Sequence, residues 1–231
     1  MKKLLSIILC IALSVAPCFA HRAPYNKLQV KQHATMHEIV MVDRDKDGKI
    51  IGSGLCTAYA VGPHTLLTAE HCNDTKATTV YVDGNSIAIH DNQEHEYVIN
   101  SRTLDHEDHM LLDLSGINFT NYLPLSDSVR LPRQGEHVYF WGCPAGVRDQ
   151  YHEGVVSGTM PTATLGELGV DATGDTLYIV AVSVVGGDSG SSVYGEDGAL
   201  IGIVTYGING GQFAGMFPIQ FTQAQINQSL Q

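Results

Sequence analysis

The sequence predicts an all-β protein. Of its 231 residues, 24 are glycine and only 16% are charged, a composition that suits short strands and tight turns better than a helical bundle. Segments rich in β-branched and aromatic residues recur along the chain, each bounded by Gly, Asn or Asp. A chain of this length forms one large all-β unit or two small domains, and periodicity alone does not decide between them.

The first twenty residues are expected to be a secretory signal peptide. Two lysines precede an apolar run over residues 4 to about 15, which is too short to span a bilayer stably. Small residues at Cys18 and Ala20 suit signal peptidase, so the mature chain is expected to begin at His21. Acylation of Cys18 is the alternative, which the preceding proline fits poorly. Residues 21–36 are a pro-segment or a first edge strand.

Net charge and cysteine content indicate which partners the protein binds and whether its compartment allows disulfides. Removal of the two lysines changes the net charge from −11 to −13, and no basic patch emerges. Nucleic acid and anionic membranes are therefore not expected as partners. Export permits a disulfide between two of the three cysteines that follow residue 20. We expect a secreted or periplasmic monomer with no cofactor and no stable membrane anchor.

A first set of six or so strands is expected within residues 37–118. The segments are 37–43, 51–61, 66–68, 79–83, 86–90, 96–102 and 109–114. Residues 43–50 begin like an EF-hand calcium loop, but Gly54 occupies the position that requires a glutamate. A hairpin turn with Asp-Gly at its tip is the favoured interpretation.

Residues 119–135 contain two prolines and several polar residues, which indicates a connector. A second set of strands follows within residues 136–231. The segments are 136–141, 151–160, 176–183, 192–194, 199–206 and 212–221. Residues 222–230 contain neither Gly nor Pro and are expected to form a short terminal helix.

A candidate nucleophile lies in the stretch from Val185 to Val193, where Ser189 is flanked by glycines. Glycine permits a sharp turn, and the N–H groups of Gly187 and Ser189 could form an oxyanion hole. A serine hydroxyl needs a base to take its proton. His71 lies upstream in Thr-Ala-Glu-His-Cys, and Asp108 begins Asp-His-Met-Leu-Leu-Asp-Leu between the two.

The order His, Asp, Ser differs from that of an α/β-hydrolase, and Ser191 also breaks the Gly-x-Ser-x-Gly pattern of that fold. The three stretches resemble the trypsin/chymotrypsin-like serine proteases, especially the bacterial secreted members. This resemblance implies two packed six-stranded antiparallel β-barrels. It also implies that His71 is the general base, that Asp108 orients it, and that Ser189 attacks the substrate.

Asp105 and Asp113 are rivals for the orienting role. Asp108 is preferred because the residues after it match the family's frame of Asp, an apolar residue, Ala, Leu and Leu. His109 and Met110 depart from that frame. The histidines of residues 106–109 do not predict a metal site, because they lack helical spacing and would point to opposite faces of a strand.

The resemblance further implies a disulfide between Cys56 and Cys72 that closes the loop around His71. Cys143 is then left over, and we expect it to be a small buried hydrophobic residue. Trypsin-like zymogens pair the aspartate before the nucleophile, here Asp188, with a new Ile-Val-Gly-Gly terminus. No such start precedes Cys56, so removal of the signal peptide or a cut within residues 21–38 could activate the chain.

The family places the base of the primary specificity pocket six residues before the nucleophile, at Ser183. The walls would come from Thr205, Tyr206, Gly207 and Gly215. Val184 and Val204 are apolar where glutamate-specific relatives carry a hydroxyl residue and a histidine. With no charge at these positions, the pocket is expected to accept uncharged residues, aromatic or large aliphatic ones first.

The expected function is that of a secreted serine endopeptidase that cleaves proteins or peptides through an acyl-enzyme. Two alternatives stay open at this point. One is an inactive, adhesive or binding homologue with the same fold, which an intact triad disfavours. The other is a processing enzyme with a single dedicated substrate.

Overall fold

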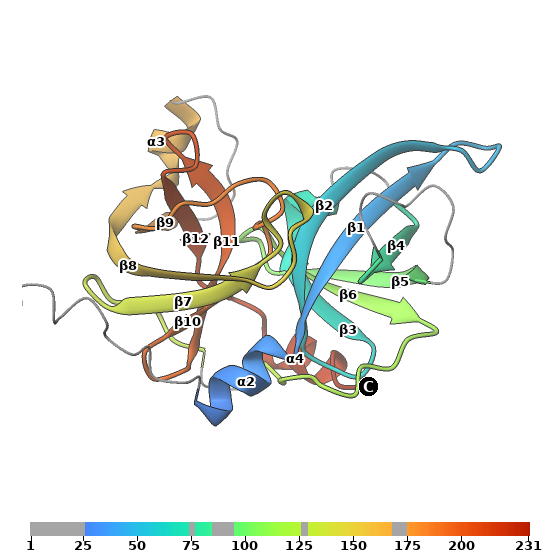
Figure 1. Ribbon diagram of the computed structural model, residues 1–231, viewed down its shortest axis with the longest axis horizontal. Helices are drawn as coiled ribbons and strands as arrows, with labels where there is room; N and C mark the ends of the chain where they lie inside the picture. Colours follow the sequence, from blue (N-terminus) through green and yellow to red (C-terminus); the bar gives the residue numbers. More distant parts are fainter. Residues whose placement is uncertain (1–25, 74–76, 85–94, 126–128, 168–174) are drawn as a thin grey trace, which may run out of the picture.

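Two closed antiparallel barrels of six strands each make up the protein (Figure 1). The computed structural model describes residues 26–73, 77–84, 95–125, 129–167 and 175–231. The strands of the first barrel are β1 (Met36–Arg44), β2 (Ile50–Ala60), β3 (Thr65–Ala69), β4 (Thr79–Val82), β5 (Glu96–Leu104) and β6 (His109–Ser115). Those of the second are β7 (His137–Gly142), β8 (Gln150–Pro161), β9 (Thr176–Val180), β10 (Ser192–Gly195), β11 (Leu200–Ile208) and β12 (Phe213–Phe217).

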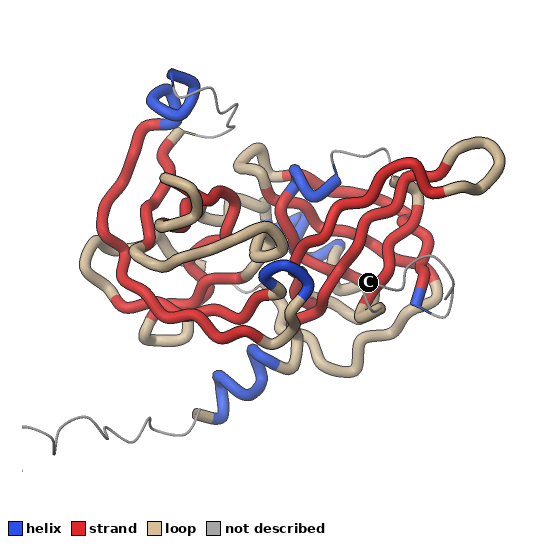
Figure 2. Tube along the Cα trace, turned by 45° about the horizontal axis from the view of Figure 1, so that its top comes forward, coloured by secondary structure: helices blue, strands red, loops and turns tan. Residues whose placement is uncertain are grey.

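Short helices complete the described chain, and the tube in Figure 2 shows how little of it they occupy. They are α2 (Lys27–His33), α3 (Thr162–Glu167), α4 (Gln223–Gln228) and the 3₁₀ turns η2 (Glu70–Asn73) and η4 (Pro144–Gly146). The all-β class, the two barrels and the short C-terminal helix are confirmed. Among the described residues, no helix is both long and apolar enough to cross a bilayer.

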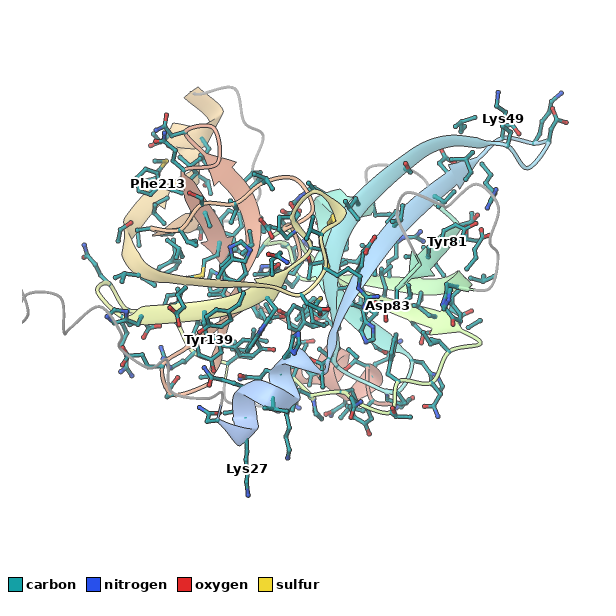
Figure 3. The ribbon with its side chains drawn as sticks, viewed as in Figure 1. Lys27, Lys49, Tyr81, Asp83, Tyr139 and Phe213 are labelled. Atoms are coloured by element: carbon teal, nitrogen blue, oxygen red, sulfur yellow. A yellow bond between two sulfur atoms is a disulfide. The ribbon has the colours of Figure 1, made fainter. Side chains whose placement is uncertain are left out.

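The β1–β2 hairpin has the expected turn rather than a calcium loop. Its tip, where Lys49 is labelled in Figure 3, projects away from both barrels. The Asp45 carboxylate accepts the backbone N–H groups of Asp47 and Lys49, each at 2.9 Å. That carboxylate therefore closes the turn by satisfying two backbone donors.

Each barrel has its own apolar core, built from alternate residues of its strands. Met110, Leu112 and Leu114 of β6 point into the first barrel, as the period-2 pattern predicts. The intervening Leu111 points the other way, into a third apolar cluster with Leu67 of β3 and Ile203 of β11. This cluster packs the two barrels against each other.

Polar contacts add to the contact between the barrels. The hydroxyl of Tyr59 on β2 donates to the Trp141 carbonyl at 2.6 Å and accepts the Trp141 N–H at 3.1 Å. Helix α4 follows the second barrel in sequence but packs on the first, where Thr65 donates to the Ser229 carbonyl at 2.9 Å. The two halves of the site are thus carried by barrels held in one arrangement.

Some elements differ from the sequence-based expectations. Residues 27–33 form helix α2 instead of an edge strand, because Asn26 and Gln29 build a reciprocal capping box at its start. Helix α3 interrupts the β8–β9 connection and was not expected. Strand β9 ends at Val180, so the approach to Ser189 is irregular chain rather than strand. The strand expected at 86–90 lies outside the described residues.

Candidate active site

Two consecutive turns place Ser189 at the edge of the second barrel. The Asp188 N–H donates to the Val185 carbonyl at 3.1 Å, and the Ser191 N–H donates to the Asp188 carbonyl at 3.0 Å. The Gly190 N–H donates to the Val204 carbonyl on β11 at 2.8 Å. These bonds leave the serine between the turns, with its side chain directed toward the first barrel.

A continuous hydrogen-bonded chain joins Ser189 to His71 and Asp108. His71 Nε2 lies 2.9 Å from Ser189 Oγ, and His71 Nδ1 lies 2.7 Å from Asp108 Oδ2. A carboxylate accepts hydrogen bonds, so Nδ1 donates to Asp108, and in the neutral imidazole the lone pair of Nε2 faces the serine hydroxyl. The His71 side chain is 33% exposed, whereas that of Asp108 is 6% exposed. Solvent and substrate can therefore reach the imidazole but not the carboxylate.

The backbone around His71 is also held by Asp108. The His71 N–H donates to Asp108 Oδ1 at 2.8 Å, and the Glu70 N–H donates to the Asp108 carbonyl at 2.8 Å. Asp108 has a φ of 63°, a left-handed conformation that aspartate tolerates better than most residues. Hydrogen bonds thus join the turn η2 to the loop before β6, and they hold the Asp108 carboxylate against the His71 ring.

The rival carboxylates have other partners. Asp105 Oδ2 lies 2.7 Å from Nδ1 of the fully buried His109, and it also accepts the Gln220 N–H at 2.9 Å. Burial raises the pKa of Asp105, but the hydrogen bond and charge of His109 outweigh it and hold that pKa below its usual value. Asp113 accepts from Asn100 at 3.0 Å on the surface. The two rivals are thus held by Asn100 and His109, whereas Asp108 bonds to the His71 ring.

Residues 106–109 do not gather into a metal site. His109 is committed to Asp105, and within the described part of the chain no three His, Cys, Asp or Glu side chains cluster as a metal ion requires. The pKa of Glu107 is raised, first by burial and then by the nearby Asp105 charge. This acidic loop contacts Gln220, in the segment between β12 and α4, whose side-chain amide donates to Glu107 at 2.8 Å.

Thr57 of β2 anchors the serine turn to the first barrel, a role that the sequence did not indicate. Its hydroxyl donates to the Gly187 carbonyl at 2.8 Å and accepts the Cys143 N–H at 2.9 Å. Its backbone N–H donates to the Ser189 carbonyl at 2.8 Å. Because these bonds cross from one barrel to the other, they set the distance between Ser189 and the residues of the first barrel.

The backbone at Gly187 is arranged to present its N–H group. Gly187 has a φ of 104°, and a Cβ there would overlap the Cys143 carbonyl oxygen, so only glycine fits. The Gly186 carbonyl accepts the Ala145 N–H at 2.7 Å, which turns the N–H of the same planar peptide, that of Gly187, the opposite way. Among the described residues, neither the Gly187 nor the Ser189 N–H donates a backbone hydrogen bond.

A pocket of about 410 Å³ opens beside Ser189. Its lining is mostly apolar or glycine and comes from Val184, Val185, Gly186, Asp188, Ser189, Val204, Tyr206, Gly207, Gly210 and Gly211. The Val184 N–H donates to the Gly211 carbonyl at 2.8 Å, which ties one wall to the other. The Tyr206 ring stacks near His71, with centroids 6.1 Å apart. The pocket and the hydrogen-bonded chain thus share one surface.

Of the six residues assigned to this pocket from the sequence, Val184, Tyr206 and Gly207 line it, whereas three others do not. Ser183 is exposed to solvent. The buried Thr205 hydroxyl donates to the Gly215 carbonyl at 3.3 Å, and a Cβ at Gly215 would meet Leu177 instead of the pocket.

The family model described as Trypsin matches residues 30–226 of this sequence. The chain belongs to the trypsin family. No curated protein matches it. The solved structure of the Rv3671c protease from M. tuberculosis in its active form is similar, with a TM-score of 0.61 and 14% identity, covering 88% of this chain and 82% of that one. The inactive form of the same protease gives a TM-score of 0.58 and 15% identity, covering 88% and 92%. At these identities the likeness is one of fold.

A disulfide in this trypsin-family chain joins Cys56 of β2 to Cys72 of η2, as expected. Cys143 is free and buried, and burial is the main reason that the pKa of its thiol is raised to about 12. The bridge closes a short loop that contains His71. It therefore ties the turn that carries the imidazole to the strand that carries Thr57.

Replacing both bridged cysteines by serine is expected to lower the free energy of unfolding by about 3 kcal/mol, because the loop then regains its entropy in the unfolded chain. Urea titration of C56S/C72S against wild type measures this, with Cys143→Ala as the control for loss of a buried unpaired thiol. Peptide mapping without reductant should recover Cys56 linked to Cys72. Recovery of Cys143 in a disulfide would contradict the assignment.

Proposed function

We propose that this trypsin-family chain is a secreted serine endopeptidase that hydrolyses protein or peptide bonds through an acyl-enzyme. The hydrogen-bonded chain from Ser189 Oγ through His71 to Asp108 is the observation that carries the proposal. A serine hydroxyl 2.9 Å from the lone pair of an imidazole is a nucleophile in contact with its base. The secreted location is supported by the N-terminal apolar segment and by the disulfide.

In this mechanism, His71 Nε2 takes the proton of Ser189 as the serine oxygen attacks the carbonyl carbon of the substrate. Asp108 keeps the imidazole in the required tautomer and stabilises the imidazolium that forms. The N–H groups of Gly187 and Ser189 donate to the oxyanion of the tetrahedral intermediate. The imidazolium then protonates the leaving amine, and a water molecule activated by His71 hydrolyses the acyl-enzyme.

Labelling with a fluorophosphonate probe tests this function directly. The folded protein should be labelled at Ser189, identified by peptide mass, and should hydrolyse casein in the same buffer. A folded protein that neither reacts with the probe nor cleaves casein would be a binding homologue of the fold. Labelling together with cleavage of a broad peptide panel would exclude a processing enzyme that has one dedicated substrate.

We further propose that cleavage follows uncharged residues, with aromatic and large aliphatic ones preferred. The pocket walls carry Val184 and Val204, and the one acidic lining residue, Asp188, is almost completely buried. Burying a charged substrate side chain among apolar walls would cost several kcal/mol. A peptide library should therefore report Phe, Tyr, Leu or Met before the scissile bond, and a preference for Arg, Lys or Glu would contradict the proposal.

Gly207→Val tests the pocket itself. A Cβ at Gly207 would lie 3.7 Å from the Val184 side chain, so added methyl groups fill the space between the walls. We expect kcat/KM for an aromatic substrate to fall roughly 10- to 100-fold, while an alanine substrate changes little. Equal losses for both substrates would show that Gly207 does not border the bound side chain.

A further inference from the structure

Asp188 is a buried carboxylate next to the nucleophile. The residue is 1% exposed, and its Oδ2 accepts the Val185 N–H at 3.0 Å, within the turn that carries Ser189. Oδ1 has no hydrogen-bond partner among the described residues, but Nε2 of His152 lies 3.5 Å from it. An ionised carboxylate in such a place requires a compensating positive charge.

His152 approaches Asp188 from inside the second barrel. It lies on β8 opposite Phe140 of β7, and the two rings stack with centroids 4.6 Å apart and planes 8° apart. The His152 side chain is 16% exposed, and its Nε2 is buried without a hydrogen-bond partner in the described chain. The ring is therefore held by Phe140 with its polar edge toward the carboxylate.

The remaining surroundings of Asp188 are neutral. The Ser191 hydroxyl is buried nearby without a hydrogen-bond partner in the described chain. The Tyr59 hydroxyl donates its proton to the Trp141 carbonyl. A Cβ at Gly142 would overlap Asp188 Oδ1, so the carboxylate occupies space that only glycine leaves. Within the described ranges, His152 is the one basic side chain that lies within ion-pair distance of Asp188.

Helix α2, which precedes β1, makes its contacts elsewhere. Gln32 of α2 donates to the Gly198 carbonyl at 2.9 Å and accepts from the Tyr139 hydroxyl at 2.9 Å. Figure 3 shows Lys27, near the start of α2, pointing away from both barrels. Helix α2 is thus anchored to the β10–β11 turn and to β7, and the side of Asp188 that faces β8 is occupied by His152.

We propose that His152 is a positioning residue, the cationic partner of Asp188 that holds residues 185–190 in the conformation that presents the Gly187 and Ser189 N–H groups. The oxyanion donors are then assembled without a free α-amino group from a newly cut chain end. This inference rests on the proposed function, because its readout is the rate of hydrolysis.

His152→Gln is the first test, since glutamine keeps polarity and approximate size but carries no charge. We expect kcat to fall about 100-fold, the scale of losing one oxyanion donor, while KM changes less than threefold. The downfield proton resonance of the His71–Asp108 hydrogen bond should persist, which shows that the triad itself is intact. His33→Gln removes the imidazole of an exposed His–Asp pair and should leave kcat unchanged.

A second test changes only the N-terminus and leaves residues 21–231 as they are, so it does not depend on the folding of a substituted protein. Protein with several residues added before His21, or with its α-amino group acetylated, should hydrolyse peptides at the unmodified rate. Loss of activity on either change would overturn the inference, as would a folded His152→Gln protein with kcat within twofold of wild type. If wild-type protein fails to hydrolyse any peptide, the proposed function itself fails, which is a distinct outcome.

Discussion

Ser189→Ala protein is expected to hydrolyse peptides roughly 10⁶-fold more slowly than wild type. The substitution removes the nucleophilic oxygen that lies 2.9 Å from His71 Nε2, so no acyl-enzyme forms. His71→Ala should cause a loss of the same order, because residues that act as one unit do not contribute additively. Steady-state hydrolysis of a chromogenic peptide measures both.

Ser191→Ala is the matched control for this experiment. Its hydroxyl lies two residues away and has no hydrogen-bond partner in the described structure, so activity should be retained. Circular dichroism should show that all three variants are folded. Hydrolysis by Ser189→Ala at the wild-type rate would remove the serine from its assigned role.

Asp108→Asn should reduce kcat roughly 10⁴-fold with little change in stability. An asparagine can present an N–H group to His71 Nδ1, which would move the imidazole proton to Nε2 and leave no lone pair toward Ser189. The loss of kcat therefore comes from the wrong imidazole tautomer and the missing carboxylate charge, because asparagine has nearly the same shape as aspartate. Pre-steady-state labelling by a fluorophosphonate should slow to the same extent.

Asp105→Asn should give the opposite pattern. Asp105 and His109 are a buried pair, and removing one charge should lower the free energy of unfolding by about 3 kcal/mol while kcat is mostly kept. Because the pKa of Asp105 is lowered in the folded state, its contribution is present above its ordinary value of 3.8 and is lost as pH falls below it. If Asp105→Asn lost activity and Asp108→Asn lost only stability, the two roles would be exchanged.

The paired behaviour of these two aspartates has a structural cause. Both lie in the loop before β6, three residues apart, and each binds one histidine. Asp108 binds the histidine of η2, which solvent reaches, whereas Asp105 binds the fully buried histidine at the start of β6. One loop therefore carries a catalytic candidate and, three residues before it, an aspartate that is held by a buried histidine.

Several features were readable from the sequence because they depend on neighbouring residues. Glycine content and β-branched runs predicted the strands, and an Asp-Gly turn predicted the β1–β2 hairpin. The helix over residues 27–33 was missed although its capping pattern, Asn26 with Gln29, is present. The two-barrel arrangement came from resemblance to a family, because period-2 patterns specify which face of a strand is buried but not which strands pair.

The all-β class, a serine set between glycines, and the order of the His, Asp and Ser motifs were all evident before the structure. The folded structure adds contacts that the sequence did not indicate: Thr57 holds the serine turn, Asp105 pairs with His109, and His152 faces Asp188, whereas Gly215 is absent from the pocket lining. The contacts of Thr57 and His152 join residues that are far apart in the chain, so no local pattern predicts them. Strand register and the packing of one barrel on the other set their distances, and neither is encoded by any short stretch of sequence.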